Sequence, residues 1–233
     1  MSFDPAVAAT LRGVSTATIT TILLKQGVRR TWMHGPRPLP SAAGKRIAGP
    51  AFTLRFIPAR EDLATPESWS SPKSTRAAIE DMPDGVVAVV DAMGLAGAGI
   101  FGDILCARMV QRGVAGLVTD GAVRDVAGVI GTGLPVWSAG VAAPASVAAV
   151  TFVDWQQPVG CGGIAVIPDD VIVADDDGAV VIPKAMLAEV LKAGPEQERL
   201  EAWIFREVQK GARLPGLYPP DAATKARYEA ENG

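Results

Sequence analysis

Apolar and β-branched residues in this chain occur in short runs, and the spacing of the runs predicts alternating helices and strands. Residues 4–26 have helical character, with the Ser15 hydroxyl suited to cap a helix and Gly27 placed to end it. Two runs, 170–175 and 179–183, flank an acidic turn and predict a hairpin. Further runs with strand character lie at 46–56, 85–91, 116–121, 135–138, 147–154 and 162–168.

Three more helices are predicted, at residues 75–81, 101–112 and 184–210. Residues 85–91 are an apolar run without alternation, which is typical of a strand buried on both faces. Together with the helix at 101–112 and the strand at 116–121, this run predicts a βαβ unit. The two strands of such a unit are parallel, and its crossover is right-handed.

Prolines and polar residues mark the connections between these elements. Residues 32–40 contain three prolines, which disfavour helix and strand and predict an ordered loop. A Gly-Pro pair at 49–50 interrupts the first strand, and residues 61–74 form a polar insertion before a helix. The last helix is weakened near 194–195, and the Pro-rich residues 214–220 predict an extended arm that lies on a partner.

One stretch, residues 126–153, contains no charged residue and is longer than the roughly 20 residues that a helix needs to cross a bilayer. However, Pro135, Pro144 and four glycines interrupt it too often for a helix in lipid. We therefore expect buried strands and turns of a soluble protein, with no membrane partner.

Composition narrows the class of protein further. The 233 residues are 48% hydrophobic and 20% charged, which excludes disorder and predicts one compact domain with a tail. The formal net charge is −3, from 22 basic and 25 acidic residues, whereas nucleic-acid binders carry a basic excess, so no nucleic-acid partner is expected. Two cysteines, Cys106 and Cys161, and the lack of a signal peptide before residues 3–5 indicate a cytoplasmic protein.

Carboxylates lie at or near the ends of the predicted buried strands, beside glycines. Asp91, Asp103, Asp120 and Asp125 fall in or next to the βαβ unit, and Arg124 directly precedes Asp125. Buried charges are costly unless they are paired, coordinated or used, and sites in α/β sheets lie at the carboxyl ends of strands. Two interpretations stay open on these residues alone: a functional site for an anion and a metal, or a buried Arg–Asp network.

The segments around these charged residues resemble a longer sequence pattern. The segments 102–105 and 112–125, in which Asp103 is followed by twenty residues and then by Arg124-Asp125, resemble the signature of a known family. This family unites RraA proteins (regulators of ribonuclease activity A) with 4-hydroxy-4-methyl-2-oxoglutarate aldolases. The similarity covers about residues 10–210. Further matching blocks are 49–53, 135–137, 161–163 and 174–180.

The chain departs from the family pattern in two respects. Pro168-Asp169-Asp170 stands where the family usually has Pro-Gly-Asp. The segments 32–40 and 61–74 and the C-terminal arm are longer than in compact members. They resemble a longer subgroup, often named ribonuclease regulators by similarity.

The resemblance implies an α/β fold: a single RraA-like domain of the swivelling β/β/α type, with a central β-sandwich or barrel-like core flanked by helices. We expect an RraA-like aldolase domain over 1–213 and an extended C-terminal arm over 214–233. It also implies a homotrimer or a homohexamer made of two trimers, with the active site between subunits.

The resemblance further implies how such a site works. Asp125 holds a divalent metal cation, Mg²⁺ or Mn²⁺, largely through water, which suits the preference of Mg²⁺ for oxygen ligands. Arg124 is catalytic and binds the carboxylate or developing enolate oxygen of a 2-oxo acid. The backbone of Gly102, Asp103, Ile104 and Leu105 at a helix N-terminus completes the substrate-binding cradle, and catalytic Asp103 orients a water that moves protons.

The favoured function is a class II, metal-dependent pyruvate aldolase. It cleaves a 4-hydroxy-2-oxo acid to pyruvate and a second carbonyl compound, with oxaloacetate decarboxylase activity on the side. A Schiff-base mechanism would need a lysine, but none of the seven lysines falls in 85–125, which leaves only Lys45 open. The alternatives are a non-catalytic regulator that binds ribonuclease E, and the same mechanism acting on a sugar-derived 2-oxo-3-deoxy acid.

Four weaker candidates each have an ordinary structural interpretation. Glu198 or Glu201 matches the glutamate that related aldolases bring to the metal from a neighbouring subunit, but a solvated helix face is the alternative. Arg46 either contacts an anion or forms a salt bridge. His34, the single histidine, either touches substrate or makes a loop hydrogen bond. The acidic turn 175–178 lacks the spaced ligands of a calcium loop, so a hairpin turn is predicted there.

Overall fold

One long strand organises the fold in the computed structural model, which describes residues 3–232. Strand β2 (Ile47–Pro58) pairs first with β8 (Val171–Asp175) in antiparallel orientation and then with β3 (Val87–Asp91) in parallel orientation. Its last residues pair with β7 (Val150–Trp155), which is antiparallel to it. Because one strand serves two layers, the described residues form a single, nearly closed mixed sheet in the order β1-β6-β5-β3-β2-β8-β9, with β4 on β5 and β7 on β2. The remaining strands are β1 (Arg37–Pro38), β4 (Gly99–Phe101), β5 (Gly116–Val123), β6 (Val136–Val141) and β9 (Gly178–Ile182).

The parallel part of this sheet contains the predicted βαβ unit. Strand β3 pairs in parallel with β5 (Gly116–Val123), and helix α4 (Asp103–Gln111) lies between them in the sequence. The short strand β4 (Gly99–Phe101) and the strand β6 (Val136–Val141) also run parallel to β5. All eight residues of β5 are buried, because the strand is covered on both faces.

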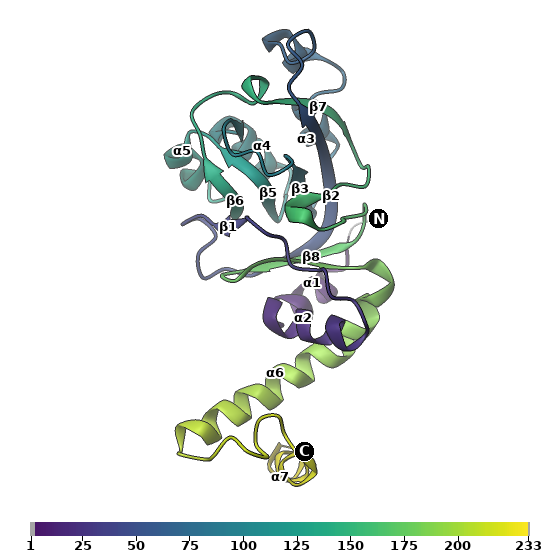
Figure 1. The fold of residues 1–233 in the computed structure, drawn as a ribbon, viewed down its shortest axis with the longest axis vertical. Coiled ribbons are helices and arrows are strands. Elements are labelled where there is room, and N and C mark those ends of the chain that lie inside the picture. Colours follow the sequence, from purple (N-terminus) through teal and green to yellow (C-terminus); the bar gives the residue numbers. More distant parts are fainter. Residues whose placement is uncertain (1–2, 233) are drawn as a thin grey trace.

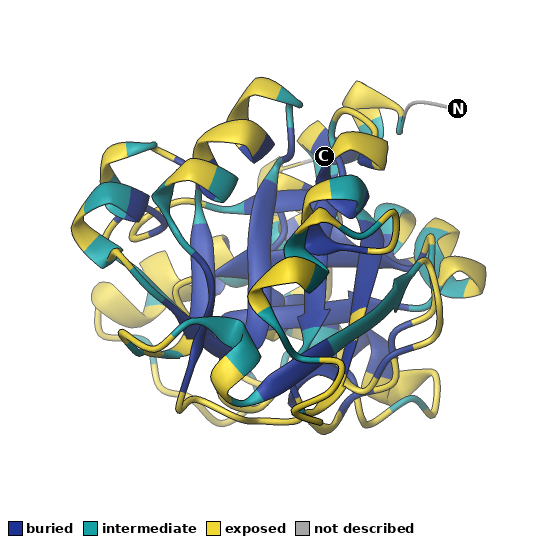
Figure 2. Ribbon diagram, turned by 90° about the horizontal axis from the view of Figure 1, so that it is seen from above, coloured by how far each residue is buried: buried dark blue, intermediate teal, exposed yellow. Residues whose placement is uncertain are grey.

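The sheet lies between two sets of helices (Figure 1). Three layers of buried apolar side chains hold these parts together. On one face of the parallel strands, helices α3 (Thr75–Asp81), α4 and α5 (Val126–Gly131) pack through residues such as Ile79 and Met109. Between the parallel strands and the β8–β9 hairpin lies a second layer that contains the fully buried Trp137. Viewed from above, the strands are buried in the centre and the helices are exposed outside (Figure 2).

The third layer joins the hairpin to the N-terminal helices. Helices α1 (Pro5–Arg12) and α2 (Thr16–Lys25) and the first part of α6 (Leu187–Gln209) pack on β8 and on β9 (Gly178–Ile182). The hydroxyl of Ser15 accepts a hydrogen bond from the Thr18 amide, so the predicted helix cap is confirmed.

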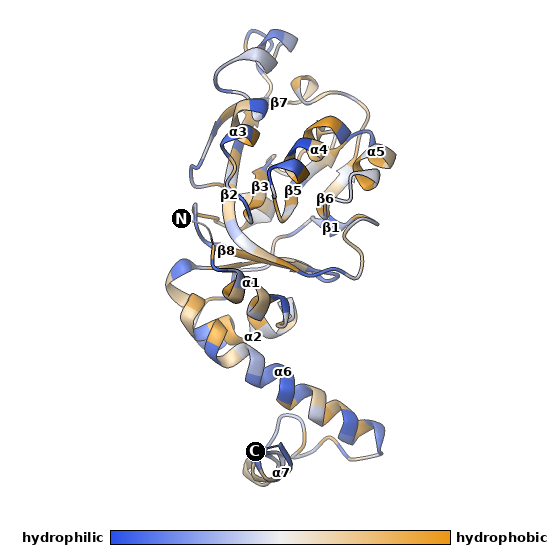
Figure 3. Cartoon of the chain, turned by 180° about the vertical axis from the view of Figure 1, so that it is seen from behind, coloured by the Kyte–Doolittle hydropathy of each residue, from blue (hydrophilic) through white to orange (hydrophobic). Residues whose placement is uncertain are grey.

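Helix α6 continues beyond the body of the molecule to a small C-terminal unit (Figure 1). Here Trp203 and Ile204 of α6 pack with Leu217 and with Tyr228 of α7 (Ala222–Asn232). In Figure 3 hydrophilic residues alternate with hydrophobic ones along this outer part of α6. Residues 214–233 were predicted to be extended, but the described ones form turns and a helix, because these few apolar side chains bury one another.

The expected fold class, an α/β domain with a barrel-like core flanked by helices, is confirmed, and so is the β8–β9 hairpin. Several local predictions were wrong. Gly49-Pro50 does not break its strand, because β2 changes partner there and the amide that proline lacks is not needed. Similarly, Arg37–Pro38 forms the edge strand β1, which pairs with β6 despite its proline.

Two further segments differ from their predicted structure. Residues 162–168 are not a strand, because Gly162 and Gly163 both have positive φ and Cys161–Gly163 forms a 3₁₀ turn, η3. The uncharged stretch after Asp125 begins with the helix α5 rather than with a strand. Other 3₁₀ turns are η1 (Pro66–Ser70), η2 (Ser146–Ala148) and η4 (Lys184–Met186).

No single helix within residues 3–232 combines the length and the apolar character needed to cross a membrane. Helices α1 and α2 meet that test only as a pair, with a bend of 98° between them.

Candidate active site

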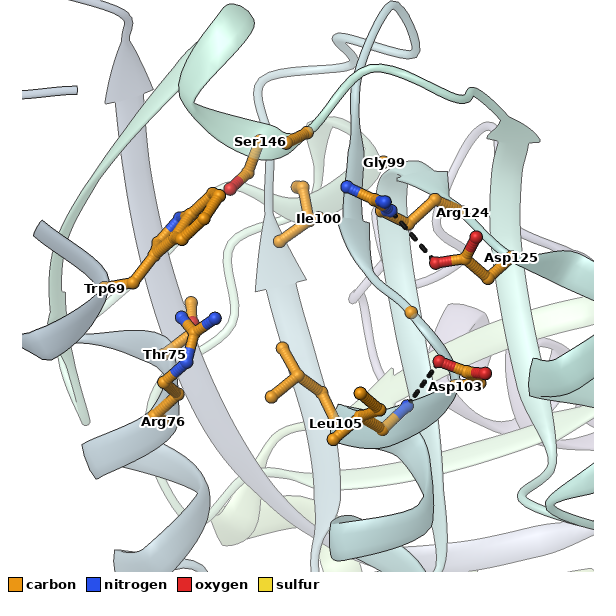
Figure 4. A pocket seen from close by; sticks show the side chains of 13 residues that line it. Trp69, Thr75, Arg76, Gly99, Ile100, Asp103, Leu105, Arg124, Asp125 and Ser146 are labelled. Atoms are coloured by element: carbon orange, nitrogen blue, oxygen red, sulfur yellow. Dashed lines mark hydrogen bonds and ion pairs between the residues drawn. The ribbon is translucent and has the colours of Figure 1, made fainter. Parts of the chain in front are cut away.

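A cavity of about 330 Å³ opens at the carboxyl end of β5, beside the N-terminus of α4. This is the end of a parallel sheet at which α/β proteins place their ligands. Charged residues, backbone of the α4 N-terminus and a separate set of residues from the 61–76 region all contribute to its walls (Figure 4). The lining residues are Trp69, Thr75, Arg76, Gly99, Ile100, Gly102, Asp103, Ile104, Leu105, Arg124, Asp125, Ala145 and Ser146.

Arg124 and Asp125 reach this cavity from the turn between β5 and α5. The Nε of Arg124 lies 3.0 Å from Oδ2 of Asp125, and their side chains are 37% and 51% exposed. Asp125 has left-handed backbone angles, φ 51° and ψ 43°, and its side chain makes no capping hydrogen bond to α5. Its carboxylate is therefore directed toward Arg124 and the cavity rather than toward the helix amides behind it (Figure 4).

Asp103 is the first residue of α4 and lies on the same side of the cavity. The Ile104 amide donates a hydrogen bond of 2.7 Å to Oδ1 of Asp103, and Gly102 is the N-cap of the helix. The side chain of Asp103 also lies against α5, where a Cβ added at Gly128 would come 2.7 Å from its Cβ. The close packing of α4 on α5 therefore brings Asp103 next to the Arg124–Asp125 pair.

Two glycines make room for the charged pair. A Cβ at Gly99 would lie 2.5 Å from Cβ of Arg124, and a Cβ at Gly102 would lie 2.9 Å from Oδ2 of Asp125. Cβ atoms essentially never come this close to another heavy atom, so a larger residue at either position would have to displace the pair. Gly102 thus makes room for the Asp125 carboxylate by its lack of a side chain.

The other two strand-end carboxylates belong to a different, structural network. Asp120 is buried and accepts hydrogen bonds from the amides of Ala92, Gly94 and Gly162. Burial raises the pKa of Asp120, and these hydrogen bonds partly offset the rise. Asp91 accepts from the Met93 and Gly160 amides. These two aspartates hold loops together, so the four carboxylates form two groups, and only Asp103 and Asp125 line the cavity.

The structure does not bring the weaker candidates to the cavity. Arg46 lies 3.4 Å from Asp175, and it also donates to the Arg12 carbonyl oxygen. The ring of His34 makes an edge contact with Trp32 at a centroid distance of 4.8 Å.

The two glutamates of α6 also have partners within the chain. Glu198 accepts a hydrogen bond of 2.8 Å from the Ser15 amide, and Glu201 accepts one from Gln197. Burial opposes ionisation of Glu198, but hydrogen bonds from Ser15 and Thr18 outweigh it, and the pKa of Glu198 lies below its ordinary value. Within one chain, Glu198 therefore caps α2, and whether a neighbouring subunit uses either glutamate stays a prediction.

The wall of the cavity opposite Arg124 was not predicted from the sequence. Trp69 lies on η1, inside the polar insertion, and Thr75 and Arg76 begin α3. The guanidinium of Arg76 lies over the Trp69 ring, 5.2 Å from its centroid. A single tryptophan in an otherwise polar insertion was the available signal, since a large aromatic in such a segment needs a surface to cover.

Neither a lysine imine nor a cysteine thiolate is supported by the residues around the cavity. No lysine lines it in the described chain, so Lys45 lies elsewhere. Both cysteines are buried, and burial raises the pKa of Cys106 to about 12 and that of Cys161 well above its ordinary value. Neither thiol is therefore available as a thiolate.

A metal held mainly through water is compatible with this donor set. Across residues 3–232, no three His, Cys, Asp or Glu side chains converge to hold a metal by themselves. Asp125 presents a half-exposed carboxylate to the cavity, and Asp103 supplies a second carboxylate on the same wall. Hard cations such as Mg²⁺ keep several waters and need only one or two carboxylates, so the residues present fit such a cation.

Comparison with known proteins identifies the class to which this fold and site belong. The profile of the Aldolase/RraA, RraA-like family matches residues 16–181. The chain is therefore a member of the RraA-like family, and the matched range contains Asp103, Arg124 and Asp125.

Particular relatives share this region. The chain is 32% identical over 175 residues to the protein DlpA of Legionella pneumophila, covering 75% of this chain but 28% of DlpA. It is 31% identical over 153 residues to a Halalkalibacterium halodurans protein named provisionally as a 4-hydroxy-4-methyl-2-oxoglutarate aldolase. That match covers 66% of this chain and 67% of the other.

Solved structures agree in fold. The chain superposes on Streptomyces coelicolor RraAS2, described as an unusual member of the RNase ES inhibitor RraA protein family, with a TM-score of 0.77 and 36% identity. The match covers 87% of this chain and 97% of that one. An uncharacterized Pseudomonas syringae protein matches with a TM-score of 0.78 and 25% identity, over 94% of this chain and 99% of its own.

Proposed function

We propose that this protein is a divalent-metal-dependent lyase that cleaves a 4-hydroxy-2-oxo acid to pyruvate and a second carbonyl compound, and that it also decarboxylates oxaloacetate. The observation that carries the proposal is the Arg124–Asp125 pair facing Asp103 across the N-terminus of α4. The family membership and the provisionally named aldolase relatives support the same class of reaction.

Asp125 would hold the cation, largely through water molecules. Asp103 would supply a second carboxylate near the cation. When bound, the cation would supply an electrophile for the 2-oxo group of the substrate. The oxygen-only donor set of this wall favours Mg²⁺ or Mn²⁺ over softer metals.

Arg124 would bind the substrate at the carboxylate and the 2-oxo oxygen. Its Nε is engaged by Asp125, which leaves the terminal nitrogens of the guanidinium directed at the cavity. A planar set of charged donors suits an oxygen on which negative charge develops. The backbone N–H groups at the start of α4 would hold the substrate carboxylate beside it.

Proton transfer would fall to Asp103 acting through a water. Cleavage removes the proton of the 4-hydroxyl and breaks the C3–C4 bond, whose electron pair forms the enolate of pyruvate, and C3 is then protonated. One oxygen of Asp103 accepts the Ile104 amide, so the other is available to orient the water that carries these protons.

Metal removal and one carboxylate variant test this proposal. Pyruvate release from oxaloacetate and from 4-hydroxy-2-oxoglutarate should require Mg²⁺ or Mn²⁺ and should stop with EDTA. Asp125→Ala should lower kcat/KM by about two orders of magnitude or more, because several kcal/mol of charge stabilisation depend on the cation. Glu229→Ala, which removes an exposed carboxylate on α7, is the matched control and should be unchanged. Activity untouched by both the chelator and Asp125→Ala would refute the metal mechanism.

A second candidate is a non-catalytic regulator that binds ribonuclease E. The 36% identity to the Streptomyces protein, which belongs to a ribonuclease inhibitor family, favours it. Capture of ribonuclease E by the intact protein, unaffected by Asp125→Ala and unaccompanied by pyruvate release from any substrate tested, would establish this function in place of the first.

A further inference from the structure

The cavity has two cationic walls. Arg124 belongs to the wall built from β5 and the start of α4, and Arg76 belongs to the opposite wall, which consists of η1 and the start of α3 (Figure 4). The proposed mechanism uses only the first of these walls. The second is built from residues that the reaction itself does not require.

The charge of Arg76 is not engaged by a carboxylate within residues 3–232. The natural partner one helical turn later, Glu80, is held by two nitrogens of Arg108 at 2.8 and 2.6 Å. Other basic residues on this side are also paired: Arg60 with Asp62 at 2.7 Å, and Lys73 with Asp154 at 2.7 Å. Arg76 alone among them lines the cavity.

The position of the guanidinium is set by an aromatic ring. The Cζ of Arg76 lies 5.2 Å from the centroid of Trp69, a distance at which the face of the ring attracts the cation. The segment that carries Trp69 is in turn tied to the sheet, because Lys73 lies 2.7 Å from Asp154 of β7. Arg76 is thus oriented before any ligand arrives, which lowers the entropic cost of using it.

We propose that Arg76, held on Trp69, determines substrate specificity by binding a carboxylate at the end of the ligand remote from Arg124. The inference rests on the proposed function and adds to it the residue that selects 2-oxo acids with a second, terminal carboxylate over those without one. A neutral, hydroxyl-rich chain derived from a sugar would leave the guanidinium without a partner. Trp69 is a positioning residue, since it acts through Arg76.

Binding of two ligands of equal chain length tests the inference without requiring catalysis. 2-Oxoglutarate has the terminal carboxylate, 2-oxopentanoate has a methyl group in its place, and neither has the 4-hydroxyl that cleavage needs. In calorimetric titrations with Mg²⁺, the wild-type protein should bind 2-oxoglutarate more tightly. Arg76→Gln should lower the affinity for 2-oxoglutarate by roughly tenfold to a hundredfold, which is the range for a hydrogen bond to a charged group. The affinity for 2-oxopentanoate should stay unchanged.

Further variants separate this role from a structural one. Arg60→Gln removes a guanidinium that directly precedes the 61–74 insertion and is already paired with Asp62, and it should leave both affinities unchanged. Arg76→Lys should restore part of the preference, because a point charge without the planar fork remains. Trp69→Phe should retain the preference, whereas Trp69→Ala should lose much of it.

A kinetic test of the same inference uses two substrates that carry the 4-hydroxyl and can be cleaved, 4-hydroxy-2-oxoglutarate and 4-hydroxy-2-oxopentanoate. Arg76→Gln should raise KM for the first and change its kcat less, with little effect on the second. An unchanged preference in Arg76→Gln, or an equal loss for both ligands, would overturn the inference. If the wild-type protein cleaves neither acid yet shows Arg76-dependent preference for 2-oxoglutarate, the lyase proposal fails and the inference stands.

Discussion

The position of the Asp125 carboxylate is set by neighbouring residues and not by a helix cap. Its backbone is in the left-handed region, and its carboxylate extends into the space beside Gly102, where it meets Nε of Arg124 at 3.0 Å. Because this side chain does not cap α5, no helix amide holds it in place. Space and a single ion pair therefore set the direction of the carboxylate.

A methyl group at Gly102 is expected to disturb this arrangement without disturbing the fold. Gly102 has φ −115° and ψ −174°, angles open to any residue, so Gly102→Ala introduces no backbone strain. The added Cβ would nevertheless lie 2.9 Å from Oδ2 of Asp125 and must push it aside. We expect kcat/KM for oxaloacetate to fall about a hundredfold, as for other misplacements near 1 Å, with little change in the melting temperature.

The control for this variant is Gly131→Ala, at the end of α5, where an added Cβ meets nothing within 4 Å. Its activity should equal that of the wild type, and its stability should be equal or slightly higher because alanine restricts the unfolded chain. Equal activity in Gly102→Ala and Gly131→Ala would show that the position of Asp125 does not matter to the reaction.

At the scale of elements, α6 connects the N-terminal helices to the C-terminal unit. Glu198 accepts the Ser15 amide at the start of α2, and Gly194 lies so close to Val14 that a Cβ there would be 2.8 Å from a Val14 methyl. Further along, Trp203 packs edge-on against Tyr228 of α7. The weakening expected at Gly194-Pro195 does not end the helix, because these tertiary contacts stabilise both of its halves.

The Glu198 contact predicts a pH-dependent contribution to stability. Its pKa in the folded protein lies below the ordinary value of 4.5, so the ionised form stabilises the fold above that pH. The contribution is lost as the pH falls from 4.5 through the lowered folded pKa. Glu198→Gln should therefore cost about 1 kcal/mol near neutral pH, typical of a lost helix cap, and the difference from wild type should shrink on acidification.

Denaturant unfolding of both proteins over this pH range measures the effect. Glu201→Gln, on the same helix and bonded to Gln197, is the comparison variant, because it leaves the contact between Glu198 and the Ser15 amide intact. A constant difference between Glu198→Gln and wild type down to acidic pH would contradict the assigned role of the carboxylate.

At the scale of the whole molecule, the cavity is assembled from segments far apart in the sequence. Residues 69–76, 99–105, 124–125 and 145–146 meet only because α3 and α4 cover one face of the same parallel layer. Several apolar side chains outside the three core layers remain exposed, among them Ile104 at the cavity and Phe205 and Tyr218 in the C-terminal part.

We expect the protein in solution to be a homotrimer or a homohexamer, as the family resemblance implies. Light scattering coupled to size-exclusion chromatography should give a mass of three or six chains across micromolar concentrations. Phe205→Glu should shift the mass toward smaller species if α6 takes part in the contact, because it places a charge in a desolvated interface. A monomeric wild-type protein would contradict both the assembly and a site shared between subunits.

Local pattern in the sequence determined the type of most elements. The unbroken apolar run in β3, the cap at Ser15 and the turn between β8 and β9 follow from periodicity and backbone preference, which act over a few residues. The same holds for the juxtaposition of Arg124 and Asp125, since they are neighbours in the chain. The spacing of Asp103 from this pair is the length of α4 followed by β5, and the family resemblance implied its significance.

Tertiary structure alone decided which residues meet across longer separations. Nothing local distinguishes Asp120 from Asp103, yet one is buried among backbone amides and the other lines the cavity. Similarly, β2 passes through a proline because its partner changes there, and Arg76 faces the cavity because Trp69 and α3 pack beside it. Sequence patterns record the preferences of short segments, whereas burial and pairing depend on the free energy of the packed whole.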